Sequence, residues 1–159
     1  MLGSAVFAVA APGTMIVLVP WLLTGWRSSD PAAWSVGLGA LLLLVGAGIS
    51  LQATTQFIVK GSGTPAPNAP PEELVVSGLY RHVRNPMYIA VVTAIAGEAL
   101  VLGRVVLFVW AGAFWLATAT WVRLYEEPTL GKRFGDQYTA YCRSVPRWRP
   151  RLTPWSPCV

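Results

Sequence analysis

Charged side chains are scarce in this chain. Asp, Glu, Lys and Arg make up 12% of the 159 residues, whereas a soluble domain carries about 25%. Hydrophobic residues make up 54%, and the mean hydropathy is +0.51. This composition argues against an ordinary soluble domain and indicates a membrane-embedded protein. The length predicts a single domain, residues 1–159.

Cysteine and histidine are scarcer still. The chain has two cysteines, Cys142 and Cys158, and one histidine, His82. So few ligands offer neither a disulfide framework nor a metal-binding cluster, so we expect free thiols and no metal. We expect His82 at the surface. Trp148 and Trp155 are expected at the membrane interface, which indole rings favour.

Long apolar runs are abundant by contrast. Four of them are long enough to be read as membrane spans, at about residues 5–26, 32–59, 86–102 and 105–125. The first has no positively charged start, which favours a retained helix over a cleaved signal. The sequence therefore predicts an all-α integral membrane protein with about four transmembrane helices.

A fifth helix is predicted over about residues 128–145, and it is amphipathic. Its apolar stripe consists of Leu130, Phe134, Tyr138, Tyr141 and Val145. Charged residues lie elsewhere on its surface. We expect this C-terminal helix to cap the bundle or to lie on the membrane rather than span it.

Proline and glycine positions predict bends and close contacts. Pro12 and Pro20 should kink the first span, and Pro128 should break the fourth helix at Glu126–Glu127. The second span is rich in glycine, and small residues in apolar helices allow close helix packing. These glycines are Gly37, Gly39, Gly46 and Gly48.

The basic residues predict the orientation in the membrane. With four spans and both termini in the cytosol, Arg27 and Arg104 lie on the far side, and the remaining basic residues lie on the cytosolic side. The net charge of +5 is scattered between apolar spans, which fits anionic lipid head groups better than nucleic acid. The cytosolic residues are Lys60, Arg81, Arg84, Arg123, Lys132, Arg133, Arg143, Arg147, Arg149 and Arg151.

Two polar motifs, residues 72–88 and 123–150, fall on the predicted cytosolic side. In the first, Asn85 suits the N-cap of the third helix and Pro86 suits its first position. The positive end of that helix can hold an anion such as a carboxylate. In the second, Arg123 and Glu126 are three residues apart and should share a helix face. They form either a structural ion pair or a functional pair.

The two motifs together carry a family resemblance. G-L-Y-R-x-x-R-N-P-M-Y, followed by R-x-x-E-E-x-x-L-x-x-x-F-G-x-x-Y-x-x-Y-x-x-x-V-P-R-W, resembles the isoprenylcysteine carboxyl methyltransferase and phospholipid methyltransferase superfamily. The resemblance implies transfer of a methyl group from S-adenosylmethionine to a lipophilic acceptor, either a small molecule or a lipid-anchored substrate, at the cytosolic membrane face. Many members have histidine where this chain has Asn85, which puts any role for an imidazole there in doubt.

The resemblance also implies site residues. Arg123 would bind an anionic group of the substrate, and Glu126 would contact the cofactor. Glu127 is a further cofactor candidate, because carboxylates suit the cationic parts of S-adenosylmethionine. The residues implied for the cofactor pocket are Glu73, Leu74, Val75, Tyr80, Asn85, Pro86, Met87, Tyr88 and Glu126.

Other interpretations stay open from the sequence. A membrane sterol-reductase-like enzyme that uses NADPH has a similar C-terminal pattern, and a membrane scaffold without catalytic activity is a third possibility. The acceptor could be a prenylcysteine carboxylate, a phospholipid amine, a thiol or another hydrophobic metabolite. Glu98 lies inside the third span, where an ionisable residue serves either function or helix packing, or snorkels to the surface. The oligomeric state is equally open.

Overall fold

The computed structural model describes residues 12–60, 74 and 76–156, with the side chains of 57–60 excepted. The regular structure of these residues is entirely helical, as predicted. Parts of the first span and the loop at 61–71 lie outside the described residues, as do Glu73, Val75 and Cys158. The elements are η1 (Thr14–Leu18), α2 (Val19–Thr24), α3 (Ala33–Lys60), η2 (Gly78–Arg81), α4 (Pro86–Leu102), α5 (Val105–Trp121), η3 (Val122–Glu126) and α6 (Glu127–Ser144).

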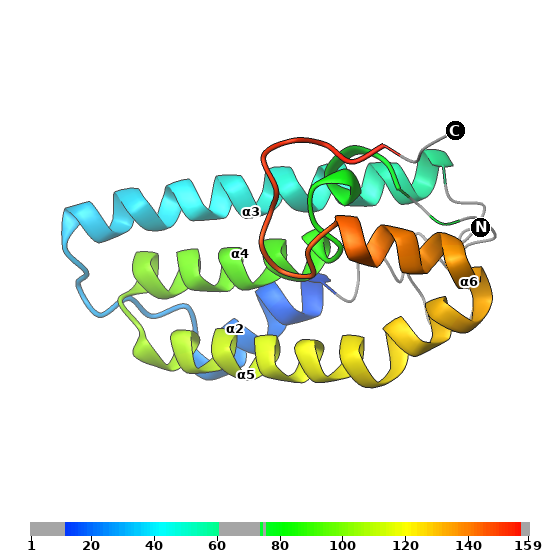
Figure 1. Cartoon of the computed structure of the whole chain (residues 1–159). Helices are drawn as coiled ribbons and strands as arrows, with labels where there is room; N and C mark the ends of the chain where they lie inside the picture. The colour runs from blue at the N-terminus through cyan, green and yellow to red at the C-terminus, as the bar shows by residue number, and fades with distance from the viewer. Residues whose placement is uncertain (1–11, 61–73, 75, 157–159) are drawn as a thin grey trace.

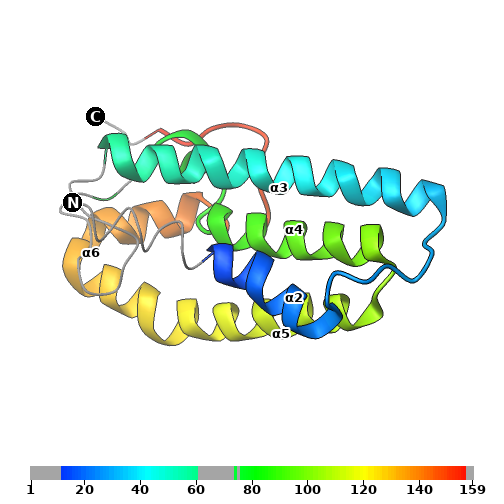
Figure 2. The same cartoon turned by 180° about the vertical axis from the view of Figure 1, so that it is seen from behind.

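Helix α4 lies between α3 and α5, and α2 packs on one side of this layer (Figure 1, Figure 2). The bounds of α4 coincide with the predicted third span. One face of α4 forms an apolar core with α5, against which Met15 and Ile16 of η1 pack. Trp110 of α5 donates a hydrogen bond from Nε1 to the backbone oxygen of Met15, 3.2 Å away. The buried core residues are Val91, Ile95, Ala99, Leu102, Leu107 and Ala111.

Glycines bring the backbones of α3 and α4 together. A Cβ placed on Gly39 would lie 2.6 Å from the backbone oxygen of Gly97, and one on Gly46 would lie 2.9 Å from that of Ala90. The predicted packing role is therefore confirmed for these two glycines of α3. It is wrong for Gly37 and Gly48, where a Cβ would meet nothing within 4 Å.

The outer surface of the bundle is strongly apolar. Trp34 and Leu44 of α3 are 72% and 73% exposed, and Val105 of α5 is 74% exposed. So large an apolar surface suits contact with lipid. By length and composition, two described helices can cross a membrane, at Ala33–Gln56 and within the continuous helix Val105–Ser144. The other two apolar helices are shorter, so the count of four spans stays a prediction.

Two π-helices stand where the sequence predicts kinks or breaks. Each ends two residues before a proline: η1 before Pro20 and η3 before Pro128. A proline cannot bond to the carbonyl four residues earlier and its ring crowds that carbonyl, whereas a widened π turn moves it aside. The predicted break at Glu126–Glu127 is therefore wrong, because the helix continues through η3 into α6.

Helix α6 reverses the direction of the chain and closes one end of the bundle (Figure 1). Its helical geometry is interrupted at Gly135, whose φ is 51°. The predicted apolar stripe is confirmed, since all five of its residues belong to one cluster with Leu74, Val76 and Trp155. Helix α6 therefore covers the loop that leads into α4.

Glu98 is packed within the bundle. The residue is only 6% exposed, and its Oε2 has no hydrogen-bond partner among the described residues. A snorkelling side chain would carry its carboxylate to the aqueous surface. Burial therefore excludes snorkelling for Glu98.

The glycine contacts yield a matched pair of substitutions on α3. Gly39→Ala should lower the free energy of unfolding by about 1–3 kcal/mol, because the new methyl group meets the backbone of α4. Gly37→Ala should be neutral or stabilising by up to about 1 kcal/mol, because alanine favours a helix and space is open there. Thermal unfolding in detergent micelles measures both, and equal shifts for the pair would contradict the packing described here.

Candidate functional site

The start of α4 lies at the centre of the first motif. Asn85 is the N-cap and Pro86 the first helical residue, as predicted. The predicted capping hydrogen bond is wrong, however. The Asn85 side chain is buried and donates from Nδ2 to the backbone oxygen of Arg147, 3.2 Å away. Because the Asn85 side chain does not cap this helix, the first-turn amides and positive dipole end of α4 could hold an anion, as predicted.

Tyr88 and Glu126 join the two motifs. The hydroxyl of Tyr88, in the first turn of α4, donates to Oε2 of Glu126, 3.3 Å away. Glu126 is the last residue of η3, and both side chains are half-buried. A carboxylate and a phenol ring therefore lie together near the start of α4, and a role for them in cofactor binding stays a prediction.

Glu127 joins the loop before α4 to the segment after α6 through ion pairs. Its Oε1 accepts hydrogen bonds from Nη1 of Arg84 at 2.8 Å and from Nε of Arg147 at 2.7 Å. Its Oε2 pairs with Nη2 of the same Arg147. The hydrogen bonds to Glu127 raise the pKa of Arg147 above its ordinary value. Both carboxylate oxygens are thus engaged. A cofactor role for Glu127 stays a prediction, and a bound cofactor would have to displace these ion pairs.

The segment after α6 runs along the loop before α4. The backbone N–H of Arg84 donates to the oxygen of Pro146, and that of Trp155 donates to the oxygen of Arg81, both at 3.0 Å. The N–H of Arg151 donates to the oxygen of His82, also at 3.0 Å, and Nδ1 of His82 lies 2.8 Å from the Arg151 oxygen. His82 is therefore half-buried rather than a surface residue. We call residues 146–156 the C-terminal strap.

Tyr80 lies in η2, within the loop before α4, and is buried. It is 8% exposed, and its backbone oxygen accepts a hydrogen bond from the hydroxyl of Tyr141 at 2.7 Å. Burial raises the pKa of the Tyr80 phenol well above its ordinary value, and the charges of neighbouring groups, Glu126 among them, act in the same direction. The phenol therefore stays neutral at physiological pH. Leu74, another implied pocket residue, packs in the α6 cluster.

Trp148 belongs to the site, which the sequence did not indicate. Its ring centroid lies 6.5 Å from that of Tyr88 and 6.2 Å from that of Trp115 on α5. Both distances are typical of packed aromatic pairs. The position of Trp148 depends on the strap, whose irregular sequence carries no periodicity from which its path could be derived.

Arg123 stands apart from these contacts. Its side chain is exposed, and it makes no ion pair with Glu126 in the structure. The physical reason is η3, since residues three apart share a face in an α-helix but not in a wider π turn. The structural ion pair considered from the sequence is therefore absent.

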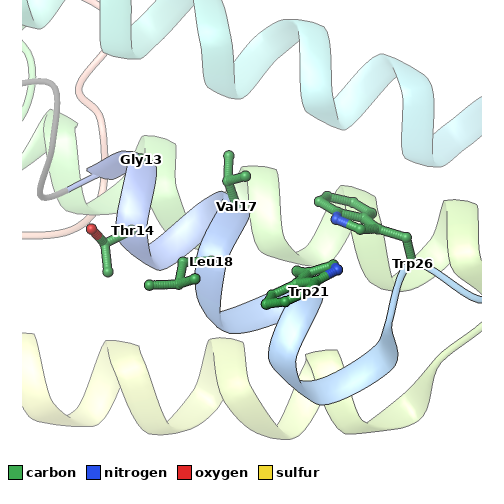
Figure 3. Close-up of a pocket in the computed structure, with 6 residues that line it drawn as sticks. All are labelled: Gly13, Thr14, Val17, Leu18, Trp21 and Trp26. Carbon is green, nitrogen blue, oxygen red and sulfur yellow. The ribbon is translucent and has the colours of Figure 1, made fainter.

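A separate apolar groove lies on η1 and α2 (Figure 3). Its volume is about 300 Å³, and it contains none of the predicted site residues. The site at the start of α4 and this groove are thus formed by different elements. The groove is lined by Gly13, Thr14, Val17, Leu18, Trp21 and Trp26.

Comparison with known proteins adds one positive finding. The family model described as phospholipid methyltransferase matches residues 34–137, which include nearly all of α3, the whole of α4 and α5, and both members of the Tyr88–Glu126 contact. No match was found among curated proteins or among solved structures. Because the match covers more than half of the sequence and includes residues from both motifs, the chain belongs to the phospholipid methyltransferase family, a family of membrane methyltransferases.

Proposed function

We propose that this protein transfers a methyl group from S-adenosylmethionine to a lipophilic acceptor at the cytosolic face of a membrane. The contact between Tyr88 and Glu126 carries the proposal, because it brings the two sequence motifs together beside the uncapped start of α4. The family match supports methyl transfer.

The residues at this junction fit the charges of the cofactor. S-adenosylmethionine supplies a methyl group on a positively charged sulfonium, together with a carboxylate and an ammonium. The Glu126 carboxylate and the ring of Tyr88 suit a positive group. The first-turn amides of α4, after Pro86, suit the carboxylate. Transfer needs the reacting groups held in line and water excluded, which half-buried aromatic side chains favour.

The surroundings of the site support a lipophilic acceptor. The exposed faces of α3 and α5 are apolar, so an acceptor dissolved in the membrane can approach from the side while the cofactor enters from water. The basic residues gathered around the motifs favour the cytosolic orientation. An isoprenylcysteine carboxyl methyltransferase-like reaction is one form of this activity. The match to a methyltransferase family favours methyl transfer over NADPH-dependent reduction and over a scaffold role.

Glu126→Gln tests the proposed cofactor contact. The substitution removes the charge and keeps the shape, so affinity for S-adenosylmethionine should fall about tenfold or more while the unfolding temperature changes little. Asp136→Asn, at an exposed position of α6, is the matched control and should bind normally. Calorimetric titration of the purified proteins measures affinity. Incubation with methyl-labelled cofactor and a total lipid extract, followed by mass spectrometry, identifies the products.

Two results would reject this assignment. Unchanged affinity in Glu126→Gln would remove Glu126 from the cofactor pocket. A wild-type protein that neither binds S-adenosylmethionine nor labels any lipid would reject the proposed function itself. Binding of NADPH in its place would support the reductase interpretation.

Arg123 is proposed to hold an anionic group of the acceptor. It is exposed and lies in η3, three residues before Glu126. If the acceptor is a carboxylate, it is already nucleophilic at neutral pH and needs a cation to orient it rather than a base. Arg123→Lys should then lower the rate about tenfold, because lysine lacks the planar fork of arginine. Affinity for S-adenosylmethionine should stay normal, and the rate should be nearly flat from neutral to mildly alkaline pH.

The control for this substitution is Arg143→Lys, at an exposed position of α6, which should leave the rate unchanged. An amine acceptor predicts a different pattern, since a lysine-like amine with a pKa of about 10.4 must lose a proton before it reacts. A rate that rises steeply with pH, together with a silent Arg123→Lys, would overturn the proposal for an anionic acceptor.

A further inference from the structure

A series of aromatic rings leads from the outside of the bundle to the proposed site. Trp115 lies on α5 and is 41% exposed on the apolar outer surface. Its ring packs on Trp148, which in turn packs on Tyr88, at centroid distances of 6.2 and 6.5 Å. The hydroxyl of Tyr88 contacts Glu126. The rings therefore form a continuous apolar wall, the aromatic wall, that ends at the proposed site.

Trp148 is held in this wall by the C-terminal strap. Figure 1 shows the strap, in red, crossing α4 near its start. Backbone hydrogen bonds fix it on both sides of Trp148: Arg84 N–H to the Pro146 oxygen before it, and Arg151 N–H to the His82 oxygen after it. Arg147, the preceding residue, is fixed by its ion pair with Glu127. An indole held by so many neighbouring contacts has a defined position between α4 and α5.

We propose that Trp148 is a specificity-determining residue that contacts the hydrocarbon chain of the methyl acceptor. This inference rests on the proposed function and adds the surface that binds the apolar part of the acceptor. The polar end of the acceptor must reach the neighbourhood of Glu126, where the cofactor is proposed to bind. Its chain must then extend towards lipid, and the aromatic wall is the apolar surface that connects these two places.

Physical chemistry favours a hydrocarbon chain as the occupant of this wall. Indole and phenol rings offer large apolar faces, and burial of a chain against them is favourable in proportion to area. Trp115 and Trp148 carry no charge that would repel such a chain. Glu126 contacts Tyr88 at the inner end of the wall, and Glu127 is paired with Arg147.

The test compares Trp148→Ala and Trp148→Phe with Trp34→Ala, a control at a 72% exposed position of α3. Each protein is placed in phosphatidylcholine vesicles containing an increasing mole fraction of total lipid extract, with methyl-labelled S-adenosylmethionine. Trp148→Ala should raise the half-saturating mole fraction of extract about tenfold. Trp148→Phe should raise it less than threefold, and Trp34→Ala should leave it unchanged. Affinity for S-adenosylmethionine should stay within twofold in all three.

Two outcomes would overturn this role. Reduced affinity for S-adenosylmethionine with unchanged half-saturation would place Trp148 in the cofactor pocket instead. Unchanged values for both would make it an interface anchor. Failure of the wild type to transfer any methyl group, by contrast, would reject the proposed function.

Fluorescence provides a measurement that needs no turnover. Vesicles of phosphatidylcholine with brominated acyl chains quench tryptophans that the chains can reach. The wild type should be quenched more than Trp148→Phe, because the aromatic wall is open to chains through Trp115. Equal quenching of the two proteins would show that hydrocarbon does not reach Trp148, and would overturn the inference whatever the enzyme assay shows.

Discussion

One carboxylate holds the proposed site together. Glu127 accepts hydrogen bonds from Arg84, before α4, and from Arg147, after α6. The three side chains are 13–30% exposed, so the attraction between them is screened less than on an open surface. Loss of Glu127 would leave two partly buried guanidinium groups without their common partner, which is strongly unfavourable. The strap, Trp148 and the Tyr88–Glu126 contact all lie next to this junction.

Close packing and proline geometry place the partners of that junction. Gly39 and Gly46 let α3 approach the backbone of α4, which fixes the axis from which Tyr88 projects. Pro128 is accommodated by η3, so the helix continues past Glu126 and Glu127 instead of ending there. The interruption at Gly135 then lets α6 fold back over the loop. A proline that should end a helix thus helps to direct two glutamates into one site.

Regular features could be predicted from the sequence, and irregular ones could not. The helix Pro86–Leu102 follows from proline at a helix start and an apolar run, and the apolar stripe of α6 follows from helical periodicity. Both are confirmed. The side chain of Asn85 was predicted to cap α4, but a tertiary contact with Arg147 competes for it. The π turn of η3 and the path of the strap depend on long-range contacts, so the separation of Arg123 from Glu126 and the place of Trp148 were not foreseen.

Hydrogen exchange with and without S-adenosylmethionine tests the central claim most directly, because it reports on both motifs in one experiment. If the two motifs form one cofactor site, the cofactor should slow amide exchange in peptides covering residues 84–90 and 122–128 together. Exchange in residues 14–24, around the separate groove, should not change. Protection of only one motif, or protection confined to residues 14–24, would contradict a shared site at the start of α4.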